Sequence, residues 1–198
     1  MLPRTTVICA VWHGDQKRRA LLEGHAKTLH DQSRAVERLY VFDNGDAPPD
    51  NLDGRSIIAP DPRTIYQAWN VALAAVRTPY VMNLNLDDRL APDAVAVLEA
   101  ALDDGADLAG GDWRVCYTQE DTDFVEGSFE AEDWPFEPGW PPVPQTVTRL
   151  GSGTGQRGTL GPAVMWRVEL HRAIGKYPDH FGDGSPILVL DADALIDL

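Results

Sequence analysis

Two adjacent acids, Asp87 and Asp88, are the residues of this chain best placed to do chemistry. They follow a continuously apolar run, residues 80–82, which is typical of a central parallel strand covered on both faces, and Asn83 and Asn85 lie between the run and the acids. In an open α/β sheet, ligands bind outside the carboxyl ends of the strands, where carboxylates can hold a divalent metal that bridges phosphate oxygens. A solvated turn is the alternative, because acids are common in turns.

The composition limits the partners that such a site can have. With 198 residues and 43% hydrophobic content, the chain can bury one substantial core, so a single domain is expected. The net charge of -14 argues against nucleic acid or an anionic membrane surface as a partner, because binding to phosphate backbones needs clustered Lys and Arg. A small phosphate-bearing ligand would therefore need a metal.

Cysteine usage and the amino-terminal residues indicate a compartment. Cys9 and Cys116 are far apart within apolar or alternating runs, which favours small core residues in a reducing compartment, although a disulfide remains open. The apolar run of residues 7–12 is too short for a signal sequence or a membrane span. We therefore expect a cytoplasmic protein without an integral membrane segment.

The elements that must position the acids begin with a strand and a helix. Residues 5–12 are β-branched and apolar and predict a buried strand, and the loop that follows it should face the crevice. Residues 16–29 predict an amphipathic helix, on which His25 and His30 are expected to be solvated. Its apolar positions are Ala20, Leu21, Ala26 and Leu29.

Two further strands and a well-marked helix follow. Residues 36–42 predict a strand that ends in Asp43 and a turn, and residues 55–59 predict a brief third strand. Thr64 and Gln67 form a capping box at the start of the next helix. The expected core-facing positions of that helix are Ile65, Ala68, Trp69, Ala72, Leu73 and Val76.

The second half of the chain has less regular patterning. A helix is predicted from Pro92 to Gly105, and residues 107–117 predict a strand, so the order β-α-β-β-α-β-α-β implies a mainly parallel sheet in a three-layer α/β/α fold. Residues 119–144 combine acids, prolines and aromatic side chains, which favours a long functional loop; a disordered linker is the alternative. The Gly-rich residues 151–158 match G-x-G-x-x-G without the required helix and predict a mobile loop. A strand end at residues 163–167 and a short helix closed by Gly175 follow.

Four acids, Asp43, Asp87, Asp88 and Asp191, are expected at strand or loop ends on one side of the sheet. Carboxylate ligands suit Mg²⁺ or Mn²⁺, whereas the five histidines show no zinc-ligand spacing.

These residues resemble the family 2-like glycosyltransferases, which have the Rossmann-like GT-A nucleotide-sugar fold. Phe42-Asp43-Asn-Gly-Asp46 is similar to the family's acidic turn that contacts the nucleobase, and Gln67-Ala-Trp-Asn-Val-Ala-Leu resembles its Ala-Arg-Asn-x-Gly-Leu helix. Asn85-Leu-Asp-Asp-Arg-Leu90 resembles its metal-binding Asp-x-Asp-Asp-x-Leu, and Asp191-Ala-Asp193 resembles its catalytic-base stretch.

The resemblance implies a role for each of these residues. Asp43 would bind the nucleoside, Asp87 would bind Mn²⁺ or Mg²⁺, and Asp191 would be the general base. Further contacts to the nucleotide sugar are expected from Trp12, Asn70, Asn85 and Asp88. Three departures weaken the transfer of roles: Asn85 replaces the first Asp of the metal motif, Trp69 replaces the helix Arg, and Leu190 replaces the Glu before Asp191.

The sequence thus predicts a metal-dependent, inverting glycosyltransferase, a hexosyl- or related transferase, that uses a nucleotide-diphosphate sugar and an unknown hydroxyl acceptor. One domain is expected, with a nucleotide-binding half (1–117), an aromatic and Gly-rich loop region (118–160) and an acceptor-side half (161–198) that could be truncated. A catalytically silent nucleotide-sugar or glycan-binding domain is one alternative. A sugar nucleotidyltransferase is another, but it would need a Gly-rich basic loop after the first strand, where only Gly14 occurs.

Overall fold

A six-stranded sheet forms the centre of the part of the chain that the computed structural model describes, which is residues 2–14, 17–111 and 163–178. The strands are β1 (Thr5–Val11), β2 (Glu37–Phe42), β3 (Arg55–Ile58), β4 (Tyr80–Asn83), β5 (Leu108–Gly110) and β6 (Val164–Arg167). Their order is β3-β2-β1-β4-β6-β5. Strands β1 to β4 are parallel to one another, whereas β6 is antiparallel to both β4 and β5. The predicted order of elements as far as β5 and the mainly parallel sheet are confirmed.

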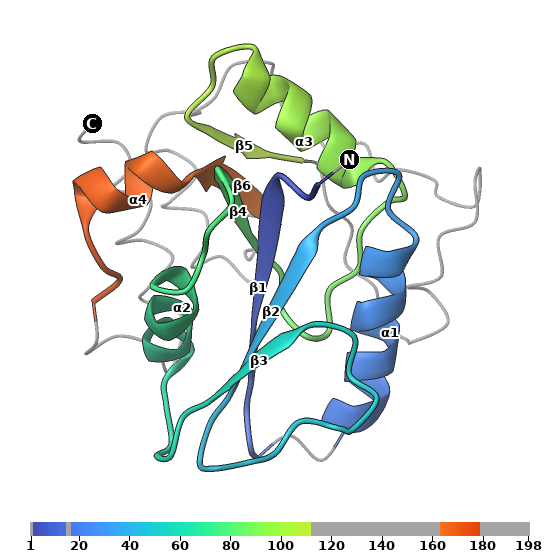
Figure 1. Cartoon of the computed structure of the whole chain (residues 1–198), viewed down its shortest axis with the longest axis vertical. Coiled ribbons are helices and arrows are strands. Elements are labelled where there is room, and N and C mark those ends of the chain that lie inside the picture. The colour runs from blue at the N-terminus through green and yellow to red at the C-terminus, as the bar shows by residue number, and fades with distance from the viewer. Residues whose placement is uncertain (1, 15–16, 112–162, 179–198) are drawn as a thin grey trace, which may run out of the picture. The chain divides into compact units, whose positions relative to one another are not determined.

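Helices cover both faces of this sheet (Figure 1). They are α1 (Arg18–His30), α2 (Ile65–Leu73), α3 (Ala94–Asp103) and α4 (Val168–Ile174). Alternate β1 side chains, Val7, Cys9 and Val11, belong to core clusters shared with α1 and α3, while α2 packs on β1 and β2. Because successive strand side chains point to opposite faces, α2 lies on the other face from α1 and α3, which gives the predicted three-layer α/β/α fold.

The capping box predicted for α2 is confirmed. The Thr64 hydroxyl accepts a hydrogen bond from the Gln67 amide at 3.2 Å, and the Gln67 side chain accepts one from the Thr64 amide at 3.1 Å. The buried face differs slightly from the prediction, because Tyr66 is buried and stacks on Trp69 with ring centroids 5.4 Å apart, whereas Ile65 is only half-buried. The strand predicted at residues 107–117 is observed as β5, and residues 112–117 lie outside the described part.

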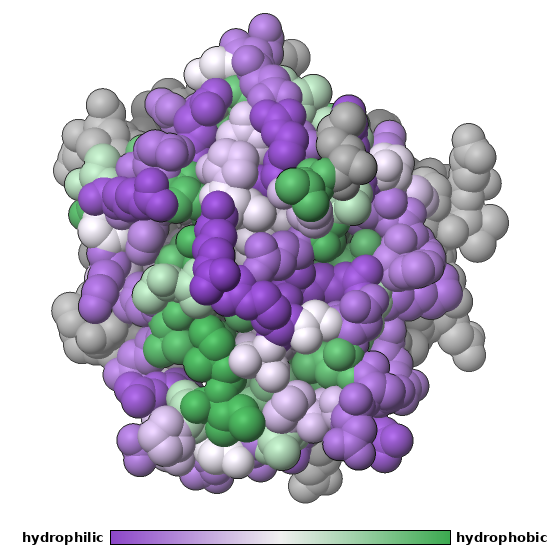
Figure 2. Space-filling view, viewed as in Figure 1, coloured by the Kyte–Doolittle hydropathy of each residue, from purple (hydrophilic) through white to green (hydrophobic). Residues whose placement is uncertain are grey.

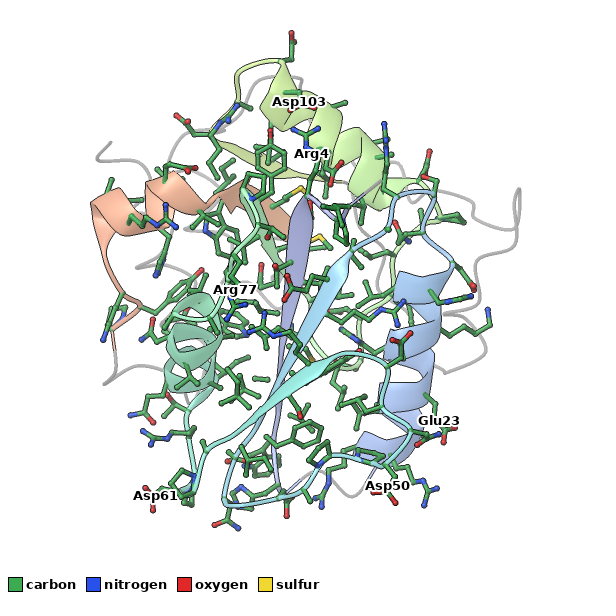
Figure 3. All side chains as sticks on the ribbon, viewed as in Figure 1. Arg4, Glu23, Asp50, Asp61, Arg77 and Asp103 are labelled. Carbon is green, nitrogen blue, oxygen red and sulfur yellow. The ribbon has the colours of Figure 1, made fainter. Side chains whose placement is uncertain are left out.

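The amino-terminal end of the sheet is closed by an ion-pair network. The Arg4 guanidinium donates to both Asp103 carboxylate oxygens, at 2.8 and 2.6 Å, and the Tyr80 hydroxyl donates to Asp103 at 2.6 Å. Figure 3 shows Arg4 and Asp103 at the end of the sheet opposite to Asp50 and Asp61. These hydrogen bonds hold the pKa of the Asp103 carboxyl well below its usual range. Asp103 therefore has a structural role, and the candidate site is sought at the other end of the sheet.

None of the helices in the described residues is long and apolar enough to span a bilayer. Figure 2 shows one face on which hydrophilic residues predominate around a smaller hydrophobic area.

Candidate active site

The loops that leave β1, β2 and β4 emerge at the same end of the sheet. Val11, the last residue of β1, pairs with Phe42, the last residue of β2, and Ile8 of β1 pairs with Asn83, the last residue of β4. Parallel pairing therefore places Trp12 and His13, the first and second residues after β1, beside Asp43, the first residue after β2.

Asp43 is buried, with 2% of its surface exposed, and N–H groups surround it. One carboxylate oxygen accepts a hydrogen bond from the His13 amide at 2.7 Å. The other oxygen lies 2.8 Å from His13 Nδ1 and accepts a hydrogen bond from the Arg63 amide at 3.1 Å. A buried carboxylate is stable only when its oxygens are hydrogen-bonded, and these three contacts meet that need within the protein.

The turn after Asp43 is fixed by its own sequence. Asn44 and Gly45 both have positive φ, of 56° and 73°, and the Asp46 amide donates to the Asp43 carbonyl at 3.1 Å, which defines a type I′ turn that Asn-Gly favours. The Gly45 amide donates to the Ala59 carbonyl at 2.8 Å, so the end of β3 holds the turn in place. An ion pair of 2.9 Å between Arg18 and Asp46 ties the turn to the start of α1.

The acidic turn after β4 has a different character. The Asp88 amide donates to the Asn85 carbonyl at 3.1 Å, while one Asp88 carboxylate oxygen is buried without a hydrogen-bond partner in the described part of the chain. Asp87 is exposed. Burial, and secondly the neighbouring charge of Asp87, raise the pKa of Asp88 to about 6. A site with an unpaired buried oxygen and surplus negative charge is suited to a cation.

Helix α1 holds this second turn from the side through Arg89. The Arg89 guanidinium donates to the Leu86 carbonyl at 3.0 Å and to the Leu21 carbonyl of α1 at 3.5 Å. Gly24 makes room for it, since a Cβ built on Gly24 would lie 2.3 Å from a guanidinium nitrogen. Replacing Gly24 by any other residue would therefore move Arg89.

Two polar side chains from the carboxyl end of α1 complete the support. The Thr28 hydroxyl donates to the Leu90 carbonyl at 3.1 Å, and the Leu90 amide donates to the same hydroxyl at 3.0 Å. Gln32, just after α1, accepts a hydrogen bond from the Val95 amide at 3.1 Å and so caps the start of α3. The chain from Leu90 to Val95 is thus anchored to α1 at both ends.

His25 corrects the sequence prediction. It is fully buried rather than solvated, with Nε2 3.3 Å from the Leu84 carbonyl and Nδ1 3.2 Å from the Tyr40 hydroxyl. Because a carbonyl only accepts, Nε2 carries the hydrogen and Nδ1 accepts from Tyr40. Burial lowers the pKa of His25 to about 4, so it stays neutral at pH 7. His30 is exposed, as predicted.

The remaining predicted contacts are placed as follows. Both atoms of the Asn70 side-chain amide bond the Tyr177 backbone, at 2.9 and 3.0 Å, so Asn70 ties α2 to the segment after α4. Trp12 is 59% exposed and packs edge-on against the His13 ring, with centroids 5.7 Å apart. Trp69, at the position of the family's Arg, is buried in an aromatic cluster with Tyr66 and Tyr177 and supplies no cation.

Several predicted features lie outside the described residues: Asp191 and Leu190, the loop of residues 119–144, the Gly-rich residues 151–158 and Cys116. Cys9 is a buried free thiol, as expected of a core residue, and burial raises its pKa.

Sequence reasoning missed the partners of Asp43, which are His13 and the Arg63 amide. The position of His13 directly after a strand that neighbours β2 was the signal that could have identified it.

Comparisons with known proteins give a fold but no family assignment from sequence. No family model and no curated protein match the chain. Among solved structures, TarS from S. aureus in complex with UDP matches with a TM-score of 0.60 at 12% identity, over 96% of this chain and 54% of that one. The mannosyltransferase PcManGT from Pyrobaculum calidifontis in complex with GDP-Man and Mn²⁺ matches with a TM-score of 0.58 at 15% identity, over 91% of this chain and 49% of that one.

A third similar structure belongs to another enzyme class. CMP:2-keto-3-deoxy-manno-octonic acid synthetase complexed with CTP matches with a TM-score of 0.55 at 10% identity, over 98% of this chain and 86% of that chain. This chain spans about half the length of the two glycosyltransferases, and identities this low establish the fold alone. The sheet topology and these similarities together show that the chain has the fold of the GT-A glycosyltransferases.

Proposed function

We propose that this chain is a glycosyltransferase domain that transfers a sugar from a nucleotide-diphosphate sugar to a hydroxyl acceptor, with inversion and with the help of Mn²⁺ or Mg²⁺. The observation that carries the proposal is the unpaired buried oxygen of Asp88 beside the exposed Asp87, at the end of the sheet where ligands of open α/β folds bind. Asp43, by contrast, receives hydrogen bonds on both of its oxygens.

The residues present fit a divalent metal. Asp87 and Asp88 offer carboxylate oxygens and Asn85 offers an amide oxygen, which are hard ligands of the kind that Mg²⁺ and Mn²⁺ prefer. The described residues contain no cluster of three or more His, Cys, Asp or Glu side chains, and a site completed by phosphate oxygens of the donor needs only one or two carboxylates. A bound metal would neutralise the charge that develops on the departing diphosphate.

The chain's own residues would divide the remaining work. Asp43, with His13 and Trp12, lies where the nucleoside is expected, and the turn of Asp87 and Asp88 lies where the diphosphate and sugar are expected. Asp191, outside the described residues, remains the predicted base: it would take the proton of the acceptor hydroxyl as that oxygen attacks the anomeric carbon from the face opposite the nucleoside diphosphate.

The structural neighbours support this assignment of ligands. TarS is in complex with UDP, and PcManGT is in complex with GDP-Man and Mn²⁺. Calorimetric titration of UDP and GDP into the chain, after removal of metal and then with Mn²⁺, tests the proposal. We expect weak binding without metal and at least about tenfold tighter binding with Mn²⁺, because phosphates repel the acidic turn.

A matched control for this titration is Asp104→Asn, which removes one exposed acid after α3. It should leave the Mn²⁺ effect unchanged. Equal affinity with and without metal in the wild type would remove the metal from the mechanism.

A sugar nucleotidyltransferase is the second candidate, favoured by the match to CMP:2-keto-3-deoxy-manno-octonic acid synthetase along 86% of that chain. The products separate the two reactions. A glycosyltransferase releases a nucleoside diphosphate from a nucleotide-diphosphate sugar, whereas a nucleotidyltransferase releases pyrophosphate from a nucleoside triphosphate and a sugar. Binding without release of either product would indicate a silent binding domain.

A further inference from the structure

His13 presents one edge of its imidazole ring to the carboxyl end of the sheet. Its Nδ1 lies 2.8 Å from Asp43, and its side chain remains 30% exposed, whereas that of Asp43 is 3% exposed. Within the described part of the chain, His13 Nε2 has no hydrogen-bond partner. The exposed Trp12 ring stands edge-on to the imidazole and offers an apolar face next to it.

The surroundings of Asp43 decide which nitrogen of His13 carries the hydrogen. An ionised carboxylate only accepts hydrogen bonds, and the other two groups that face Asp43 are the N–H groups of His13 and Arg63. Nδ1 must therefore donate to Asp43, and in the neutral imidazole Nε2 is left as an acceptor. A hydrogen-bond acceptor is thus held rigidly beside an exposed aromatic ring.

We propose that His13 reads the nucleobase of the donor, and that Asp43 is a positioning residue that acts through it. This inference rests on the proposed function. The Nε2 acceptor matches the ring N–H of uracil and guanine, whereas the corresponding nitrogen of cytosine and adenine is itself an acceptor and is repelled. Trp12 supplies the face on which a base of either kind can stack. The carboxylate of Asp43 already accepts three N–H contacts from the protein, so it would not itself bind the base.

The test compares UDP, GDP, CDP and ADP in calorimetric titrations at a fixed Mn²⁺ concentration. The wild type should bind UDP and GDP about 3- to 10-fold more tightly than CDP and ADP, the range expected for one neutral hydrogen bond. In His13→Phe, which keeps an aromatic ring without the acceptor, this preference should fall below about twofold. The matched control His30→Phe, on the exposed end of α1, should keep the wild-type preference.

Nitrogen-15 NMR of the histidine side chains gives a second readout, taken on the folded wild type. The signal that disappears in His13→Phe should show a protonated Nδ1 and an unprotonated Nε2 in the wild type. A wild-type His13 with its hydrogen on Nε2, or a base preference that survives in His13→Phe, would overturn the assignment of His13 and leave the proposed function standing. Failure of all four nucleotides to bind the wild type would overturn both.

Discussion

Strands β2 and β4 lie on either side of β1, and each is followed by a loop that carries an acid. These two acids have opposite surroundings. Asp43 after β2 receives hydrogen bonds on both oxygens, whereas Asp88 after β4 keeps a buried oxygen without a partner in the described residues and has its pKa raised to about 6. The number of N–H groups that face a carboxylate therefore separates an acid that holds the architecture from one that is ready for a cation. Residue type does not separate them, since both are aspartates in a loop that follows a strand.

The largest effect on stability is expected from removing Asp43, the acid whose two oxygens are both hydrogen-bonded. Asp43→Ala leaves the part-buried amides of His13 and Arg63 without their acceptor, and each such loss costs about 1 to 3 kcal/mol. The free energy of unfolding in urea, measured without metal, should fall by about 3 kcal/mol or more. Asp104→Ala, an exposed acid, should change it by less than about 0.5 kcal/mol. A loss below about 1 kcal/mol for Asp43→Ala would show that the amides find other partners.

The two acids of the turn after β4, Asp87 and Asp88, should behave in the opposite way. Asp87→Asn should reduce the gain in nucleotide affinity that Mn²⁺ gives by at least about tenfold, because a charged ligand is lost. Asp88→Asn should raise the metal-free stability by on the order of 1 kcal/mol, since it relieves repulsion between neighbouring charges and removes a buried charge. Calorimetry and urea unfolding check the two effects separately. A fully retained Mn²⁺ response in Asp87→Asn would exclude Asp87 as a ligand.

Lowering the pH should change stability through two groups, His25 and Asp88, whose contributions have opposite signs. His25 has a folded-state pKa of about 4, below its ordinary value of 6.5, so the unfolded state binds more protons and stability is lost as the pH falls from about 6.5 to 4. Asp88 has a folded-state pKa of about 6, above its ordinary 3.8, so its contribution to stability grows as the pH falls through the same window. In the wild type these two contributions largely cancel near pH 5.

Asp88→Asn removes one side of this balance. Its free energy of unfolding should fall more steeply than that of the wild type between pH 6 and pH 4.5, by about 1 kcal/mol per pH unit. Urea unfolding at several pH values measures both slopes, and the other carboxylates contribute equally to each. Parallel curves for the two proteins would mean that Asp88 is already solvated in the folded state.

The smallest effect concerns the support that α1 gives to the acidic turn. Gly24→Ala gains up to about 1 kcal/mol of helix propensity but displaces the Arg89 guanidinium, so the net change in stability should be small while the Mn²⁺ response weakens. A double-mutant cycle with Arg89→Ala identifies the cause, because the second change should add little to the first if Gly24 acts through Arg89. Additive effects on the Mn²⁺ response would point to a route that bypasses Arg89.

The elements could be predicted because their signals are local. The Thr64 and Gln67 capping box lies within one helical turn, and the strand ends at Asp43 and before Asp87 are marked by apolar runs followed by acids. The antiparallel direction of β6 was not predicted, because β6 pairs with strands far away in the sequence.

The contacts within the site could be predicted only in part, because many of them join residues that are far apart in the sequence. His25 lies at helical spacing with Leu22 and Leu29, both buried, so the spacing indicated a core position. The polar character of histidine led instead to the prediction of a solvated side chain. The saturation of Asp43 depends on amides that lie 30 and 20 residues away in the sequence, and no local pattern reports such donors.

The pairing of β5 with β6 has a consequence for how this fold can diversify. Gly110 and Val164 are partners on adjacent antiparallel strands, so residues 112–162 are inserted between two anchor points that the sheet itself fixes. Closing a loop between fixed anchors becomes only slightly less favourable as the loop lengthens, by about 0.6 kcal/mol for each doubling of its length. The two anchors therefore place only a weak limit on the number of residues that can join them.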